Sequence, residues 1–155
     1  MRIYLPATLD ELDPPAGGGP VVLAPRRVHA VTPALVAALP EEDDEEHEYA
    51  AQLGAADDAL LLVAARPAAP QLRLVLAADV PDAHVSPVGD DGVAPSLVDL
   101  TEPVTLAQVV CGHVDEPEAV ADVEAAVTGD EQALDRLAER DLLWYDVSEL
   151  GAIPR

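Results

Sequence analysis

The chain has 155 residues, with 30 acidic side chains and eight basic ones, which gives a formal net charge of −22. All eight bases are arginine, so the chain lacks the lysine that a P-loop, a Schiff base or a Ser–Lys dyad requires. Nucleic-acid binding is disfavoured as well, because it needs a basic surface that releases counterions from phosphates. Half of the residues are apolar, which predicts one folded domain over residues 1–155 rather than a disordered chain.

We expect neither a membrane anchor nor a disulfide. The first residues do not have the apolar core of a signal peptide. The longest apolar run, residues 59–65, has seven residues, whereas a membrane helix needs about 20. Cys111 is the only cysteine, which excludes an internal disulfide and a cysteine-based zinc cluster. The sequence therefore predicts a soluble cytoplasmic protein.

The hydrophobic pattern predicts strands and helices that are mixed along the chain but do not alternate strictly. In chain order we expect a strand over 2–5, a helical turn after Thr8, strands over 21–24 and 28–31, helices over 33–40 and 41–65, strands over 72–78, 85–88, 97–100 and 108–114 (the second and third joined through Gly89–Gly92), helices over 116–128 and from 131, and a strand over 142–147. This order indicates an α+β fold, with a mixed, mostly antiparallel sheet of about five to seven strands packed with three or four helices.

Capping residues mark the expected helix starts. The candidates are Thr8 with Glu11, Thr32 followed by Pro33, Asp115 with Glu118, and Asp130. Residues 72–78 are apolar at both alternating positions except at Arg73, which is typical of a strand covered on both faces. We therefore place this segment in the centre of the sheet.

The expected helix over 41–65 has an apolar seam at spacings of 4, 3, 4 and 3. The seam consists of Tyr49, Leu53, Ala56, Leu60 and Val63. Extended backwards, it reaches Glu46, Glu45 and then Glu42, so we expect some of these carboxylates, Glu45 and Glu46 above all, at the edge of the buried face. Partial burial there would raise the pKa of a carboxyl group.

An acidic block opens the same helix, since seven of the eight residues from 41 to 48 are acidic and the eighth is His47. The acids are Glu41, Glu42, Asp43, Asp44, Glu45, Glu46 and Glu48. Acids in a first helical turn favour the positive end of the helix dipole, but neighbouring acids repel one another, so capping does not explain all seven. The block is a candidate docking face for a basic partner or a cation site.

Two further explanations of the overall charge remain open. The absence of Lys, Asn and Phe is typical of a GC-rich genome, and an acid surplus also suits high ionic strength. Carboxylates spaced regularly on one surface would instead mimic the charge of a nucleic acid.

Trp144 and Tyr145 lie on the last expected strand. Side chains alternate across a strand, so one ring should face the core and the other should face outward. An outward aromatic ring is a candidate partner contact, because such residues dominate interface energetics.

Acids and histidine at strand ends form a second candidate site, consisting of Asp79, Asp82, His113 and Asp115. If the strands that end near Asp79 and Asp115 are parallel neighbours, these side chains converge at one edge of the sheet. Such a group would bind a divalent metal ion or act as acid and base. Turn formation and helix capping are the alternative roles of these residues.

Cys111 and His113 lie two residues apart on one face of an expected strand. A nearby imidazolium would lower the pKa of the thiol. Side chains at this spacing start roughly 7 Å apart, which is too far for a direct hydrogen bond unless they lean toward each other. A small buried thiol is the alternative role of Cys111.

Three segments carry a resemblance to a known family. They are residues 1–8, 77–82 and 142–150, and the acidic run into 48–51 and residues 113–115 fit the same pattern. In these segments the chain resembles a family of small acidic proteins of unknown function from GC-rich actinobacteria. The resemblance spans nearly the whole chain and implies no activity.

Taken together, these features favour a non-catalytic interaction or regulatory protein that binds a basic partner through its acidic helix face. The alternative is a divalent-metal-binding protein or a small metal-dependent hydrolase that uses the strand-end Asp/His site. No nucleophile elbow, dinucleotide fingerprint or EF-hand loop is present. We expect no cofactor apart from a divalent cation in the second case.

Overall fold

The computed structural model describes residues 1–88 and 93–155, so the expected connection Gly89–Gly92 lies outside the described residues. The strands are β1 (Arg2–Ala7), β2 (Val22–Leu23), β3 (Arg27–His29), β4 (Leu74–Asp79), β5 (Val85–Pro87), β6 (Leu97–Leu100), β7 (Val104–Thr105), β8 (Val109–Val114) and β9 (Leu143–Asp146). The α-helices are α1 (Pro33–Ala38), α2 (Asp44–Ala65), α3 (Val120–Val127) and α4 (Glu131–Ala138). Short 3-10 helices are η1 (Leu9–Leu12), η2 (Asp82–His84), η3 (Pro117–Ala119) and η4 (Val147–Ala152).

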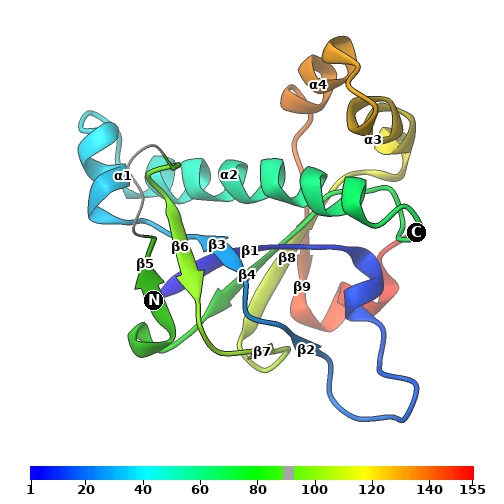
Figure 1. Cartoon of the computed structure of the whole chain (residues 1–155), viewed down its shortest axis with the longest axis horizontal. Coiled ribbons are helices and arrows are strands. Elements are labelled where there is room, and N and C mark those ends of the chain that lie inside the picture. The colour runs from blue at the N-terminus through cyan, green and yellow to red at the C-terminus, as the bar shows by residue number, and fades with distance from the viewer. Residues whose placement is uncertain (89–92) are drawn as a thin grey trace.

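Seven strands form one sheet in the order β5-β6-β3-β1-β4-β8-β9, and β2 pairs with β7 in a small second sheet (Figure 1). Each of the pairings among the described strands is antiparallel. The α+β class, the number of strands in the large sheet and the number of helices expected from the sequence are therefore confirmed. The sequence does not predict β7, which has only two residues.

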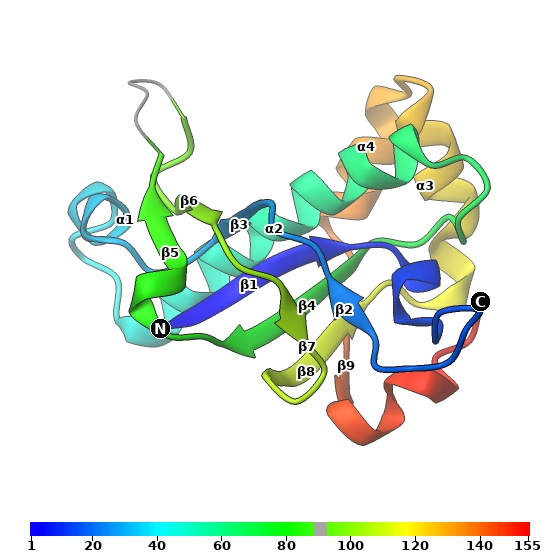
Figure 2. The same ribbon diagram turned by 60° about the horizontal axis from the view of Figure 1, so that its bottom comes forward.

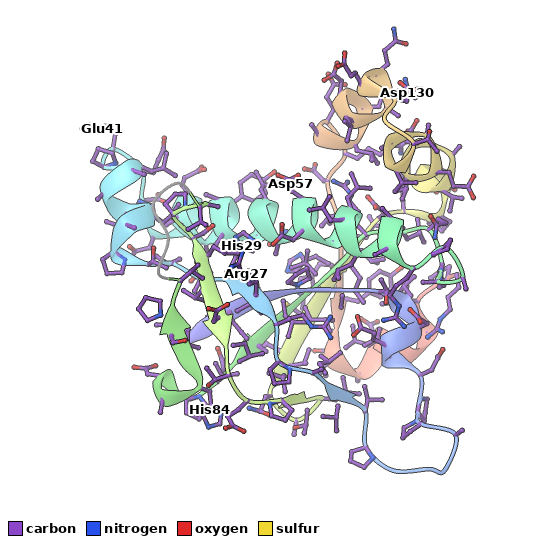
Figure 3. All side chains as sticks on the ribbon, viewed as in Figure 1. Arg27, His29, Glu41, Asp57, His84 and Asp130 are labelled. Atoms are coloured by element: carbon purple, nitrogen blue, oxygen red, sulfur yellow. The ribbon has the colours of Figure 1, made fainter. Side chains whose placement is uncertain are left out.

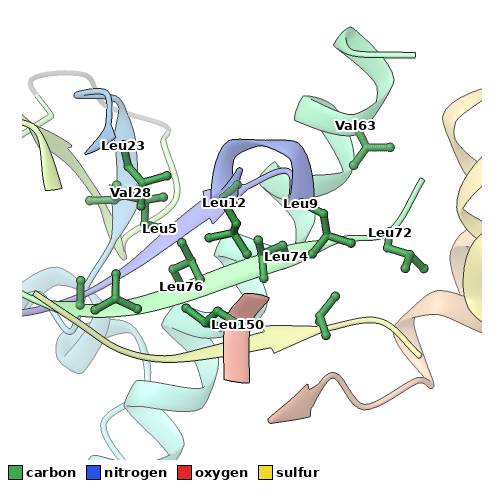
Figure 4. Packing of buried hydrophobic residues seen from close by; sticks show 14 of the residues in the cluster. Leu5, Leu9, Leu12, Leu23, Val28, Val63, Leu72, Leu74, Leu76 and Leu150 are labelled. Carbon is green, nitrogen blue, oxygen red and sulfur yellow. The ribbon is translucent and has the colours of Figure 1, made fainter. Parts of the chain in front are cut away.

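The large sheet separates two apolar layers, and alternate side chains of β1 belong to different layers. Ile3 and Leu5 belong to the main core, whereas Tyr4 belongs to a smaller cluster beneath α2. Figure 2 shows α2 on one side of the sheet and the segments η1, β2 and η4 on the other. Most of the main core, shown in Figure 4, lies between the sheet and these segments, and Val63 joins it from the last turn of α2. Its labelled residues are Leu5, Leu9, Leu12, Leu23, Val28, Val63, Leu72, Leu74, Leu76 and Leu150.

Strand β4 is buried on both faces, as the sequence predicts. Leu74 and Leu76 pack in the main core, and Val75 and Ala77 pack beneath α2. All four side chains are at most 2% exposed. Because β1 and β8 flank it, β4 lies inside the sheet and its backbone is paired on both sides.

Helix α2 packs against the sheet through small residues, so the buried seam expected from the sequence is wrong in its first half. The buried positions are His47, Ala51, Ala55, Ala56, Ala59 and Val63. Tyr49 and Leu53, the first two residues of the expected seam, are 47% and 45% exposed. Alanine lets the helix backbone approach the sheet closely, where larger side chains would hold it away. Glu45 and Glu46 are consequently exposed and do not lie at the edge of a buried face.

Gly54 lies where α2 packs closely against His29 of β3. A Cβ atom at this position would lie 2.6 Å from Nδ1 of His29, which is buried beneath the helix. The His29 ring is also held by Ser96, whose Oγ lies 2.7 Å from Nδ1, and by Asp58, whose Oδ2 lies 3.1 Å from Nε2. The absence of a side chain at Gly54 is therefore a packing requirement.

Replacing Gly54 with alanine should destabilise the fold. Alanine improves helix propensity by about 1 kcal/mol, but overpacking against the fixed His29 ring costs about 1–3 kcal/mol. We expect a net loss of about 1 kcal/mol in the free energy of unfolding, measured by urea titration. Gly151→Ala is the control, because its Cβ would meet no atom within 4 Å. Equal stability of the two variants would contradict the packing described here.

A buried ion pair joins the start of β4, the end of β8 and α4. Arg73 Nε lies 3.0 Å from Oδ2 of Asp115, and Nη2 lies 2.8 Å from Oδ1. Asp115 Oδ2 also accepts the Arg73 backbone N–H at 2.8 Å, and Nη2 donates to the Leu137 carbonyl oxygen at 3.2 Å. The two side chains are 7% and 0% exposed. Asp115 was expected to cap a helix, but Glu116 takes the N-cap position of η3 instead.

Removal of the cation from this pair should strongly destabilise the protein. Arg73→Met leaves the Asp115 carboxylate buried without a partner, which costs about 3–5 kcal/mol. Arg73→Met combined with Asp115→Leu should restore most of this loss, since no buried charge remains. Urea titration measures both variants, and Arg155→Met, which breaks the more exposed pair with Asp13, should cost at most about 1 kcal/mol. A single variant as stable as this control would refute the role of the pair.

Candidate functional site

The acidic block lies at the start of α2, at the end of the helix remote from α3 and α4, where Figure 3 labels Glu41. The helix begins at Asp44 rather than at Glu41, because Asp43 is the N-cap and accepts the Glu46 N–H at 3.0 Å. His47 is buried beneath this first turn, and its Nε2 donates to the Leu39 carbonyl oxygen at 2.9 Å. All seven acids of the block are exposed.

The arginines do not neutralise this block. Each of the eight forms an ion pair elsewhere in the described residues, and the pairs are Arg2–Asp79, Arg26–Glu11, Arg27–Asp99, Arg66–Asp10, Arg73–Asp115, Arg136–Asp122, Arg140–Glu116 and Arg155–Asp13. Across residues 1–88 and 93–155, no acid of the block takes part in an ion pair with arginine. Its charge is therefore left to solvent ions or to a partner.

A groove follows one side of α2, and we call it the α2 groove. At its start, an N-terminal cavity of about 230 Å³ lies between α2 and strands β1, β4 and β8, and it is lined by Arg2, Tyr4, Glu45, Glu48, Tyr49, Gln52, Ala77, Cys111 and His113. Further along α2, a C-terminal cavity of about 390 Å³ lies between α2 and the α4–β9 segment. Tyr49 and Gln52 line both cavities, so the two cavities adjoin each other along the helix.

Acidic and aromatic side chains meet in the N-terminal cavity. The Tyr4 hydroxyl donates to Oε2 of Glu48 at 3.0 Å, and burial together with this carboxylate raises the pKa of Tyr4 well above its usual value. Tyr4 therefore stays protonated and holds Glu48 at the groove. Glu45 lies one turn earlier on the same wall.

Trp144 stands beside this cavity on the edge strand β9. It is 59% exposed, and it pairs across the strands with His113, which lines the cavity. Tyr145 points to the opposite face and packs against the main core. The expectation that one ring faces the core and the other faces outward is confirmed. Two features that lie about 100 residues apart in the sequence, the acidic block and Trp144, thus share one face of the protein.

Cys111 and His113 are closer than their spacing predicts. The Cys111 Sγ lies 3.5 Å from Nε2 of His113, because both side chains lean toward each other on the α2 side of β8. Burial raises the pKa of the Cys111 thiol and lowers the pKa of His113. Both groups are therefore neutral near pH 7, which is the opposite of an activated thiolate–imidazolium pair. Cys111 is a buried thiol, as its alternative role predicts.

Cys111 should consequently react slowly with a thiol reagent such as DTNB. The reactive form is the thiolate, and a raised pKa shifts its formation to higher pH. We expect the rate to keep rising above pH 9, and we expect the same thiol in guanidinium-unfolded protein to react faster at pH 8. A rate that levels off below pH 8 in the folded protein would show that His113 activates the thiol.

The second candidate site is not assembled. Strands β4 and β8 are antiparallel, so the expectation of parallel neighbours with converging ends is wrong. Asp79 lies at one end of β4, where it pairs with Arg2 at 3.0 Å, whereas Asp115 pairs with Arg73 at the other end. Asp82 accepts from the Met1 ammonium group at 3.0 Å, and His113 lies in the α2 groove. In the part of the chain that the structure describes, no three His, Cys, Asp or Glu side chains are grouped to hold a metal ion.

The structure also brings together a Ser–His–Asp set that the sequence analysis did not find. Ser96, His29 and Asp58 are joined by the two hydrogen bonds of the His29 ring. Ser96 is only 4% exposed, so a substrate does not reach its hydroxyl, and the carboxylate occupies the solvent side of the ring. We interpret the set as a structural link between α2, β3 and the segment before β6. A glycine inside a long helix, Gly54, is the sequence signal that marks this close packing.

Comparison with known proteins gives one match. The chain belongs to a family of unknown function (DUF6912), whose model matches residues 1–153. The resemblance to an uncharacterised family is therefore confirmed. Neither a curated protein nor a solved structure matches the chain. Among residues 1–88 and 93–155, no helix has both the length and the apolar character that crossing a membrane requires.

Proposed function

We propose that the N-terminal cavity of the α2 groove binds a basic segment of a partner protein, and that this family member is an interaction protein. One observation carries the proposal: Glu45 and Glu48 line a groove beside the exposed ring of Trp144. Carboxylates next to an aromatic face form a suitable site for arginine and lysine side chains, which combine a cationic head with an apolar stem.

The charge distribution supports a cationic occupant. A net charge of −22 attracts a basic segment over long distances and accelerates its encounter with the groove. All eight arginines are engaged in internal ion pairs, so the surface near the block offers such a segment no unpaired arginine. Arg2 also lines the N-terminal cavity, but its guanidinium group is paired with Asp79, so the net field at the block is negative.

The exposed aromatic rings make the binding specific to this face. Tyr49 and Trp144 are 47% and 59% exposed, and they stand on the helix side and the strand side of the groove. A cation over an exposed aromatic ring gains about 0.5–1 kcal/mol, and an exposed ion pair gains up to about 1 kcal/mol. A few such contacts give a weak, reversible complex rather than a permanent one.

The single tryptophan reports binding directly. We expect an eight-residue peptide of alternating arginine and alanine to change the fluorescence of Trp144 saturably at low salt. Glu45→Gln with Glu48→Gln should weaken binding about tenfold, which corresponds to about 1.4 kcal/mol. Glutamine at position 48 still accepts the Tyr4 hydroxyl, so the groove keeps its shape.

Glu118→Gln with Glu124→Gln is the matched control, because it removes the same charge from exposed positions on and beside α3. The proposal requires that this control binds like the wild type. If both double variants weaken binding equally, the peptide responds only to the net charge. The proposal also fails if the complex persists unchanged in 1 M salt, where the screening length is about 3 Å.

A further inference from the structure

The C-terminal cavity of the α2 groove has the size and the lining of a small-molecule site. Its volume of about 390 Å³ lies within the range of about 300–1,000 Å³ that is usual for ligand pockets. Leu53, Leu137 and Leu142 supply apolar walls from α2, α4 and the segment before β9. The charged residues of the lining are Asp57, Arg73, Arg140 and Asp141, and Arg140 is paired with Asp122 and Glu116 outside the cavity lining.

Arg73 presents a fixed cationic group to the cavity. Its Nε and Nη2 atoms are held by Asp115 and by the Leu137 carbonyl oxygen. Its Nη1 atom has no hydrogen-bond partner among residues 1–88 and 93–155, although the side chain is only 7% exposed and lines the cavity. A guanidinium group that is held in place with free N–H groups is a preferred donor to a carboxylate.

Asp57 presents an anionic group to the same cavity from the middle of α2, where Figure 3 labels it. Burial raises the pKa of Asp57, and the nearby Arg73 acts in the opposite direction. The two side chains form no ion pair or hydrogen bond with each other in the described residues. Both side chains line the cavity, so it offers a ligand one cationic and one anionic group.

We propose that this cavity binds a free α-amino acid with an apolar side chain. The ligand ammonium contacts Asp57, the ligand carboxylate accepts from Nη1 of Arg73, and the side chain packs against Leu53, Leu137 and Leu142. The site goes beyond the proposed function, because it uses a different cavity and a different class of ligand.

The charges favour a zwitterion over a simple ion. The protein carries a net charge of −22, so a ligand with a net negative charge is repelled. A simple cation satisfies Asp57 but leaves the Nη1 N–H groups of Arg73 without an acceptor. An amino acid carries both charges next to each other and has no net charge, so it pairs with both groups without being repelled by the protein.

Isothermal titration calorimetry tests the proposal with L-leucine and three related compounds. L-leucinamide lacks the carboxylate, N-acetyl-L-leucine lacks the ammonium group, and glycine lacks the side chain. We expect L-leucine to bind saturably with one molecule per chain, and we expect each of the other three to bind at least tenfold more weakly.

Variants locate the binding in the cavity. Asp57→Asn should reduce the affinity for L-leucine at least tenfold, whereas Asp44→Asn, which removes an exposed charge near the start of the same helix, should leave it unchanged. Arg73→Lys should also weaken binding, because it keeps a cation beside Asp115 but removes Nη1. Thermal unfolding without ligand shows whether each variant is folded at the temperature of the titration.

Three results would overturn the proposal: no saturable binding of L-leucine, equal affinity for L-leucine and L-leucinamide, or an unchanged affinity in Asp57→Asn. The Glu45→Gln, Glu48→Gln variant separates this proposal from the proposed function. It should weaken the basic peptide without changing the affinity for L-leucine. Each site can therefore fail while the other stands.

Discussion

The buried pair of Arg73 and Asp115 fixes one end of the molecule. Two charges removed from water are costly, and only good geometry with further hydrogen bonds offsets that cost. Here the carboxylate accepts both the side chain and the backbone N–H of Arg73, and the guanidinium also reaches the Leu137 carbonyl oxygen. The pair thereby sets the distance between β4, β8 and α4. The pair therefore also fixes the end of α4 that lines the C-terminal cavity.

The α2 groove follows from the width of the sheet. A helix is about 10–12 Å across and neighbouring strands are about 4.8 Å apart, so one helix covers only two or three strands. Helix α2 contacts β3, β1 and β4 and covers Cys111 on β8, but it leaves Trp144 on β9 largely exposed. His113 pairs with Trp144 across these two strands. The groove therefore lies along the side of α2, where the helix no longer covers the edge of the sheet.

The sequence predicts most local features of the fold, although not the role of Asp115, and it does not predict the long-range contacts. Thr32 and Asp130 cap their helices as expected, because a cap depends on residues only three positions away. The ion pair of Arg73 with Asp115 joins residues 42 positions apart, so no local sequence pattern predicts it. The sequence predicts the wrong buried face for the first half of α2, because alanines occur on several sides of this helix. The size of the side chains therefore does not show which side packs against the sheet. Because β4 and β8 are antiparallel, Asp79 and Asp115 lie at opposite ends of the sheet. No local sequence pattern predicts the order or the direction of these strands.

The alanine face of α2 limits the size of the side chains on the side of the helix that packs against the sheet. A side chain larger than alanine at Ala51 or Ala55 would lift the helix from the sheet, whereas a smaller one would remove little volume. On the opposite side, Tyr49 and Leu53 are free of this limit because they face the groove and solvent. Divergence among relatives should therefore be narrow on one side of α2 and wide on the other. A large residue that relatives nevertheless share on the exposed side of α2 is then conserved for binding rather than for the fold.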